Sequence, residues 1–124
     1  MNNNYLFRVQ DQDGRGPFKP GFSHNWVIDR EDNINLIPYM MEFDEDKMKL
    51  INEHIRNGLH LGCGCRTIEK LRRWFTKKEY ATLIKYGYKA VAIKYDTIIA
   101  ESETQCVFSN KDTLNKSCSI IRLY

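Results

Sequence analysis

Residues 76–95 read TKKEYATLIKYGYKAVAIKY and join two kinds of secondary-structure signal. Thr76 is followed three residues later by Glu79, and this pair forms the capping box that opens a helix. The helical pattern stops at Gly87, a residue type that favours helix ends. Residues 88–95 are then mostly apolar, which predicts a largely buried strand. We therefore expect a helix here that leads directly into a core strand.

Further helices are expected before this stretch. Residues 44–57 begin with acidic side chains, carry apolar residues at helical spacing and end at Gly58, which predicts a helix. Residues 67–75 show a shorter amphipathic pattern and predict a second helix. Pro38 makes residues 36–43 an edge strand or an extended connection.

Strands are expected on both sides of these helices. The predicted strands cover residues 5–9, 59–65, 105–108 and 119–124, whereas residues 97–100 form a short apolar connection. Helices in the middle of a chain, with strands before and after them, are typical of an α+β fold. We expect a mixed or antiparallel sheet in one domain over residues 1–124.

The composition is that of a globular protein. Apolar residues make up 42% of the 124 residues, charged residues make up 28%, and the net charge is +3. This mild charge permits a nucleic-acid partner without favouring one. No apolar run approaches the roughly 20 residues that span a bilayer, and the first residues lack a secretory signal. We therefore expect a soluble protein of the cytoplasm with no membrane partner.

The cysteines are expected to be reduced thiols, some of them buried. Cys63 and Cys65 are too close in sequence for a usual zinc pair, and no second histidine stands at ligand spacing from His60. A packed histidine beside buried thiols is favoured over a metal site or a Cys–His nucleophile pair. No metal is expected.

Three polar side chains alternate just ahead of an apolar run. Glu101, Glu103 and Gln105 would share one face of an extended chain, because successive side chains of a strand point to opposite faces. Carboxylates at a strand end can hold a sugar hydroxyl or stabilise an oxocarbenium-like centre. The alternative is an ordinary polar face of an edge strand.

Two arginines are candidate phosphate ligands. Arg8 lies on the first predicted strand, and Arg15 lies in a glycine-flanked loop whose backbone N–H groups can assist anion binding. The alternative is a surface arginine and an ordinary turn. The loop, residues 11–25, is long for a small domain, and Phe18 and Phe22 are expected to hold it against the body of the protein.

Aromatic and basic residues interleave over residues 70–88. Such a mixture can stack on nucleic acid. The helical spacing favours core packing of the aromatic side chains with a solvated basic face.

Several short motifs follow one another in chain order: Phe7-Arg8-Val9, Gly14-Arg15-Gly16-Pro17-Phe18, Trp74-Phe75, Tyr86-Gly87-Tyr88 and residues 101–108. This order resembles the small ADP-ribosyltransferase fold. In that family an early strand carries a basic residue for NAD, and a late strand carries a glutamate in a Glu-x-Glu or Gln-x-Glu motif. Two positions differ, because Gln105 stands where the family has its glutamate and residues 60–63 replace a Ser-Thr-Ser strand.

The resemblance implies an NAD-dependent mono-ADP-ribosyltransferase-like protein. Its target would be a macromolecule, a protein in preference to a nucleic acid. The residues implied for NAD are Arg8, Arg15, Phe18, Phe22 and His60, with an aromatic side chain stacked on nicotinamide. Those implied for holding the ribose and stabilising the transition state are Glu103, Glu101 and Gln105.

The resemblance also implies a biological setting. Small solitary domains of this kind occur as toxins and as phage or mobile-element factors that disable host defences, including anti-CRISPR proteins, in the host cytoplasm. One alternative is a non-catalytic binding protein on the same fold that inhibits a partner by occupancy. Another is a nucleic-acid-binding module that uses the basic residues around 72–78.

Overall fold

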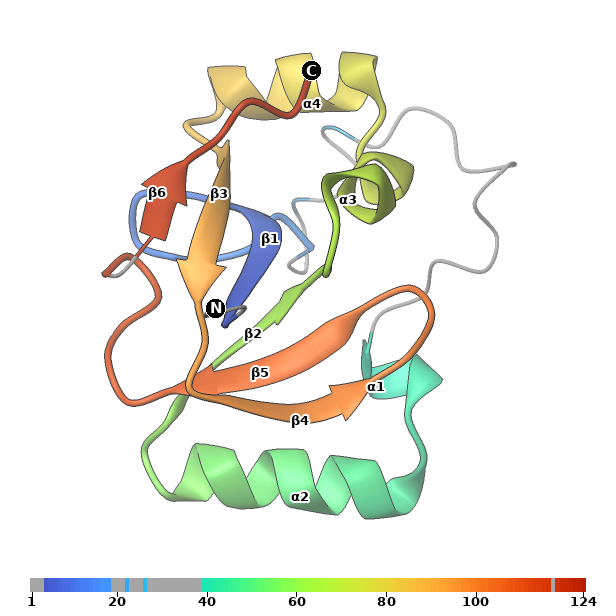
Figure 1. Cartoon of the computed structure of the whole chain (residues 1–124), viewed down its shortest axis with the longest axis vertical. Helices are drawn as coiled ribbons and strands as arrows, with labels where there is room; N and C mark the ends of the chain where they lie inside the picture. Colours follow the sequence, from blue (N-terminus) through green and yellow to red (C-terminus); the bar gives the residue numbers. More distant parts are fainter. Residues whose placement is uncertain (1–3, 19–21, 23–25, 27–38, 117) are drawn as a thin grey trace.

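The computed structural model describes residues 4–18, 22, 26, 39–116 and 118–124. Along these residues one strand is followed by two pairs of helices with a strand between them, and then by four consecutive strands, an α+β arrangement as expected (Figure 1). In chain order they are β1 (Tyr5–Gln10), α1 (Tyr39–Glu42), α2 (Glu45–Arg56), β2 (His60–Gly64), α3 (Ile68–Trp74), α4 (Lys77–Lys85), β3 (Lys89–Lys94), β4 (Thr97–Glu101), β5 (Cys106–Asn110) and β6 (Cys118–Ile120).

In the described part of the chain the strands form two antiparallel sheets of three strands each, where a single mixed or antiparallel sheet was expected. One sheet has the order β1-β3-β6 and the other has the order β2-β5-β4. An isolated bridge joins them, in which the Phe7 N–H donates to the Cys65 carbonyl at 2.8 Å and the Cys65 N–H donates back at 2.7 Å. Figure 1 shows α2 along the β2-β5-β4 sheet and α4 at the opposite end of the molecule.

The three longer helices begin where the sequence predicts. Asp44 caps α2 by accepting from the Lys47 N–H at 2.9 Å, and Thr67 caps α3 by accepting from the Lys70 N–H at 3.1 Å. The Thr76 capping box at the start of α4 is complete. These side chains satisfy backbone donors that a helix start leaves without partners.

Among the described residues, the core is divided into three apolar clusters. The largest lies under α3 and α4 and includes Trp26, Trp74 and Leu83. A second cluster around Phe108 lies between the sheets, and a third is formed where α2 buries Ile51 against the β2-β5-β4 sheet. Phe18 and Phe22 both contact aromatic residues of the body, as expected for this loop.

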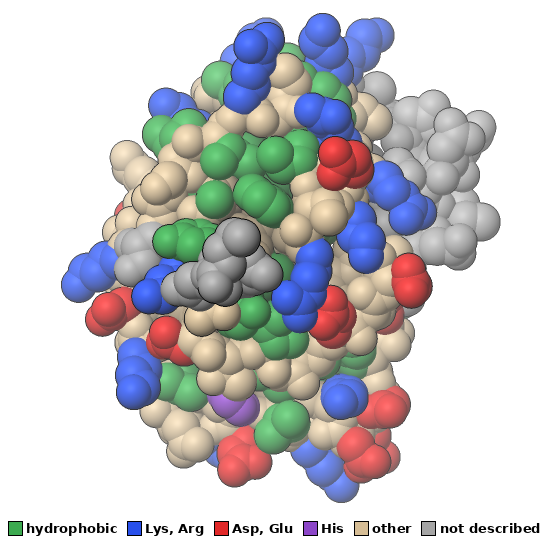
Figure 2. Space-filling view, in the orientation of Figure 1, with side chains coloured by type: hydrophobic (Ala, Val, Ile, Leu, Met, Phe, Trp, Pro, Cys, Tyr) green, Lys and Arg blue, Asp and Glu red, His purple; other side chains and the backbone are tan. Residues whose placement is uncertain are grey.

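The basic side chains of α4 lie outside this core. Lys77, Lys78 and Lys85 are exposed, whereas Trp74 and Phe75 are buried, which agrees with a packed aromatic core and a solvated basic face. Tyr86 departs from this prediction, because it is 51% exposed. Figure 2 shows Lys and Arg side chains gathered at the α4 end of the molecule.

Three segments differ from the sequence prediction. Residues 97–101 form strand β4, not an apolar connection, because they pair with β5 through a tight turn. Tyr39–Glu42 is a helical turn where an extended segment was expected, and residues 36–38 lie outside the described part of the chain. The last strand ends at Ile120, although the Ile121 N–H still donates to the Ala90 carbonyl at 3.0 Å.

Within the described ranges, no helix is long and apolar enough to cross a membrane. The same residues contain no group of three or more His, Cys, Asp or Glu side chains arranged to hold a metal ion.

Candidate functional site

A cavity of about 280 Å³ lies where the two sheets meet. Its walls come from β1, the loop after β1, α1, β2, α3 and the residue that precedes β5. The side chains that carry its chemistry are Arg8, Phe18, Tyr39, Cys63, Trp74 and Gln105. Three of the residues predicted from the sequence, Arg8, Phe18 and Gln105, therefore line one cavity although they are far apart in the chain.

Arg8 is the buried cation of this cavity. Its side chain is 5% exposed, and burial lowers the pKa of the guanidinium from its ordinary value. Nη1 donates to the Cys63 carbonyl at 3.2 Å and Nη2 donates to the Gly14 carbonyl at 3.3 Å. Nε has no hydrogen-bond partner, and no described carboxylate forms an ion pair with Arg8. A buried charge without a counter-ion is costly, so an anion at this place would relieve that cost.

Two glycines make room for the Arg8 guanidinium. A Cβ atom on Gly62 would lie 2.1 Å from Nη1, and one on Gly16 would lie 3.4 Å from Nη2. Gly62 in β2 is therefore required, because the Arg8 side chain approaches its backbone closely. The sequence shows that glycines interrupt residues 59–65 but does not show that an arginine fills the space.

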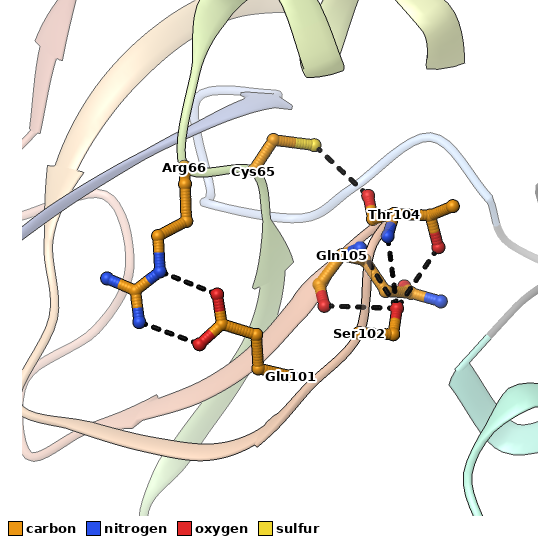
Figure 3. Close-up of polar contacts among 6 residues, drawn as sticks. All are labelled: Cys65, Arg66, Glu101, Ser102, Thr104 and Gln105. Carbon is orange, nitrogen blue, oxygen red and sulfur yellow. Dashed lines mark hydrogen bonds and ion pairs between the residues drawn. The ribbon is translucent and has the colours of Figure 1, made fainter.

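The predicted acidic residues are not among the residues that line the cavity. Glu101 ends β4 and accepts two hydrogen bonds from Arg66, at 2.6 and 2.8 Å, on the surface (Figure 3). Arg66 thereby lowers the pKa of the Glu101 carboxyl to about 2. Glu103 is exposed in the β4–β5 turn and is not among the cavity residues.

The expectation that Glu101, Glu103 and Gln105 share one strand face is therefore wrong. The chain turns between β4 and β5, with the Ser102 N–H donating to the Gln105 carbonyl at 2.9 Å. The Ser102 hydroxyl also accepts from the Thr104 and Gln105 N–H groups (Figure 3). A turn breaks the alternation that a continuous strand would produce. Of the three residues, Gln105 is the one that lines the cavity.

A carboxylate that the sequence analysis missed contacts this turn. Glu42, at the end of α1, accepts hydrogen bonds from the Gln105 amide at 2.9 Å, the Ser102 hydroxyl at 2.7 Å and the Thr104 hydroxyl at 3.0 Å. The only sequence signal was an acidic residue in a segment expected to be extended. Its contacts depend on α1 and on the turn, neither of which was predicted.

The remaining predicted NAD residues lie outside the cavity. Arg15 is exposed, and its backbone N–H donates to Asp11 within the loop. His60 is exposed at the start of β2, so the prediction of a packed histidine is wrong. Phe22 stacks on Tyr88 with ring centroids 5.5 Å apart.

The cysteines are free thiols, as expected. Burial raises the pKa of Cys63 to about 11 and the pKa values of Cys65 and Cys106 to about 12. A protonated thiol is a poor nucleophile, so Cys63 contributes an apolar surface to the cavity at neutral pH.

Residues 1–120 match the family model described as Bacteriophage T4 Y00F protein, and the chain therefore belongs to this bacteriophage family. No match was found among curated proteins or among solved structures. The family supports the expected phage origin.

Proposed function

We propose that this phage protein binds NAD in the cavity beside Arg8 and acts as an ADP-ribosyltransferase-like protein on a macromolecular target in the host cytoplasm. We expect the target to be a protein in preference to a nucleic acid. The observation that carries the proposal is the buried Arg8 guanidinium, which lacks a carboxylate partner among the described residues and shares one cavity with Phe18 and Gln105.

The residues of the cavity fit the chemical groups of NAD. A diphosphate offers anionic oxygens to Arg8, which can donate in a fixed fork geometry. Phe18 and Trp74 offer aromatic surfaces to a nicotinamide ring, and the Gln105 carboxamide can hydrogen-bond a ribose hydroxyl. A volume of about 280 Å³ is slightly below the roughly 300–1,000 Å³ of ordinary ligand sites, so we expect the nicotinamide riboside end inside and the adenosine end outside.

Bound NAD would supply an ADP-ribosyl group on a glycosidic bond with nicotinamide as the leaving group. The chain would contribute positioning: Arg8 holds the phosphate, Gln105 orients the ribose, and the aromatic walls exclude water. The dominant contribution of the protein would be a fixed orientation of the bond that breaks.

Calorimetric titration with NAD, ADP-ribose and nicotinamide tests the binding step. Arg8→Met should weaken NAD binding about 10- to 100-fold, because it removes charged hydrogen bonds to phosphate. Arg15→Met is the matched control, since Arg15 is exposed and outside the cavity, and it should bind as the wild type does. Absence of binding heat with the wild-type protein would overturn the NAD proposal.

The second candidate function is that of a non-catalytic binding protein, which inhibits a partner by occupying it. It is favoured by the absence of Glu101 and Glu103 from the described cavity lining and by an amide at position 105. Incubating host lysate with the protein and biotin-labelled NAD separates the two candidates. Labelled host protein supports transfer, whereas NAD binding without any label supports occupancy.

A further inference from the structure

We infer that Glu42 is a positioning residue of the cavity, which sets the orientation of the Gln105 carboxamide and thereby the kind of ligand group that Gln105 accepts. The ligand part of this inference rests on the proposed function. The contact itself belongs to the unliganded protein and can be tested without NAD.

Glu42 connects two walls of the cavity. It is the last residue of α1, whose Tyr39 and Met40 line one wall. Its Oε1 atom accepts from Gln105 Nε2 on another wall. The Ser102 hydroxyl donates to the same Oε1 atom, and the Thr104 hydroxyl donates to Oε2, so both carboxylate oxygens bind the β4–β5 turn.

The chemistry of a carboxylate fixes the orientation of the amide. An ionised carboxylate can only accept hydrogen bonds, so Gln105 must turn its NH₂ group toward Glu42. The carbonyl oxygen of the same carboxamide then lies on the other edge of the group. Because Gln105 is buried, with 6% exposure, the reverse orientation would place two acceptors against each other away from water.

This orientation selects among ligand groups. Because its NH₂ group donates to Glu42, Gln105 contributes its carbonyl oxygen to the cavity wall as a hydrogen-bond acceptor. Hydroxyl and carboxamide NH₂ groups are donors, and a nicotinamide riboside carries both kinds. We therefore expect the ligand to place a hydroxyl or an NH₂ group against Gln105.

The test compares Glu42→Gln with Glu101→Gln. Both changes remove one carboxylate that accepts hydrogen bonds, but Glu101 pairs with Arg66 on the surface and is not a cavity residue. Glu42→Gln offers the Gln105 amide a side chain that can donate as well as accept, and should weaken NAD binding about tenfold or more. It should also shift the Gln105 side-chain NH₂ signal in the nitrogen–proton NMR spectrum of the unliganded protein, whereas Glu101→Gln should change neither quantity.

A double variant keeps the inference testable if Glu42→Gln folds poorly. Glu42→Gln with Gln105→Glu retains one carboxylate and one amide across the same contact, but position 105 now offers a negative charge to the ligand. It should fold and bind NAD weakly, and binding equal to the wild type would contradict the inference.

The outcomes separate the inference from the proposed function. If Glu42→Gln leaves both the Gln105 signal and the NAD affinity unchanged, Glu42 has no positioning role. If the Gln105 signal shifts while the wild-type protein binds no NAD, the positioning role stands and the NAD proposal fails.

Discussion

Replacing Gly62 by alanine should destabilise the protein through the space that Arg8 occupies. A Cβ atom at this position would lie 2.1 Å from Arg8 Nη1, 2.8 Å from Phe108 Cζ and 2.9 Å from Leu114 Cδ1. Arg8 cannot move freely, because two backbone carbonyls hold its guanidinium, and Phe108 is fully buried. Overpacking costs about 1–3 kcal/mol, and loss of a hydrogen bond to a charged group adds about 1.5–3 kcal/mol.

We therefore expect Gly62→Ala to lower the free energy of unfolding by about 2.5–6 kcal/mol, measured by urea denaturation with unchanged m-value. Gly58→Ala is the matched control. Gly58 has φ +78° and no atom within 4 Å of an added Cβ, so its substitution should cost only about 1–2 kcal/mol of backbone strain. A loss for Gly62→Ala no larger than that for Gly58→Ala would refute the close packing of Arg8 against β2.

Three further predictions concern stability and reactivity. Because Arg66 lowers the pKa of Glu101 from 4.5 to about 2, this pair should stabilise the fold above about pH 4.5 and cease to do so as the pH falls toward 2. The effect should be under about 1 kcal/mol, because both side chains are 40% exposed. Glu101→Gln should remove this pH dependence of the free energy of unfolding. Thr76→Ala should cost about 1 kcal/mol in urea denaturation through loss of the capping box, and an unchanged midpoint would contradict it. Cys65 and Cys106, with pKa values near 12 and little exposure, should react with a thiol reagent at pH 8 only after unfolding; rapid labelling of the folded protein would disagree.

Elements with local signals were predictable from the sequence. The starts of α2, α3 and α4 depend on Asp44, Thr67 and Thr76, whose side chains bond backbone groups three residues away. Nothing distant is needed to form these contacts.

Features that depend on distant partners were not predictable. Strand β4 forms because Thr97–Glu101 pairs with β5. The polar residues of the turn between the two strands resemble the alternating pattern of one continuous strand, so the sequence does not reveal the turn. The burial of Arg8 follows from β2 lying beside β1, so that Gly62 faces a guanidinium. The role of Glu42 requires α1 to lie against that same turn. Each of these depends on segments that are far apart in sequence.

The isolated bridge between Phe7 and Cys65 connects the two sheets through a single pair of residues. Arg8 belongs to one of these sheets, and Gln105 directly precedes a strand of the other. A ligand that contacts both side chains would connect the two sheets a second time, and the complex would resist rotation of one sheet against the other. Ligand binding should then slow hydrogen exchange at the Phe7 and Cys65 amides. Binding in one cavity would in this way reduce the motion of both sheets.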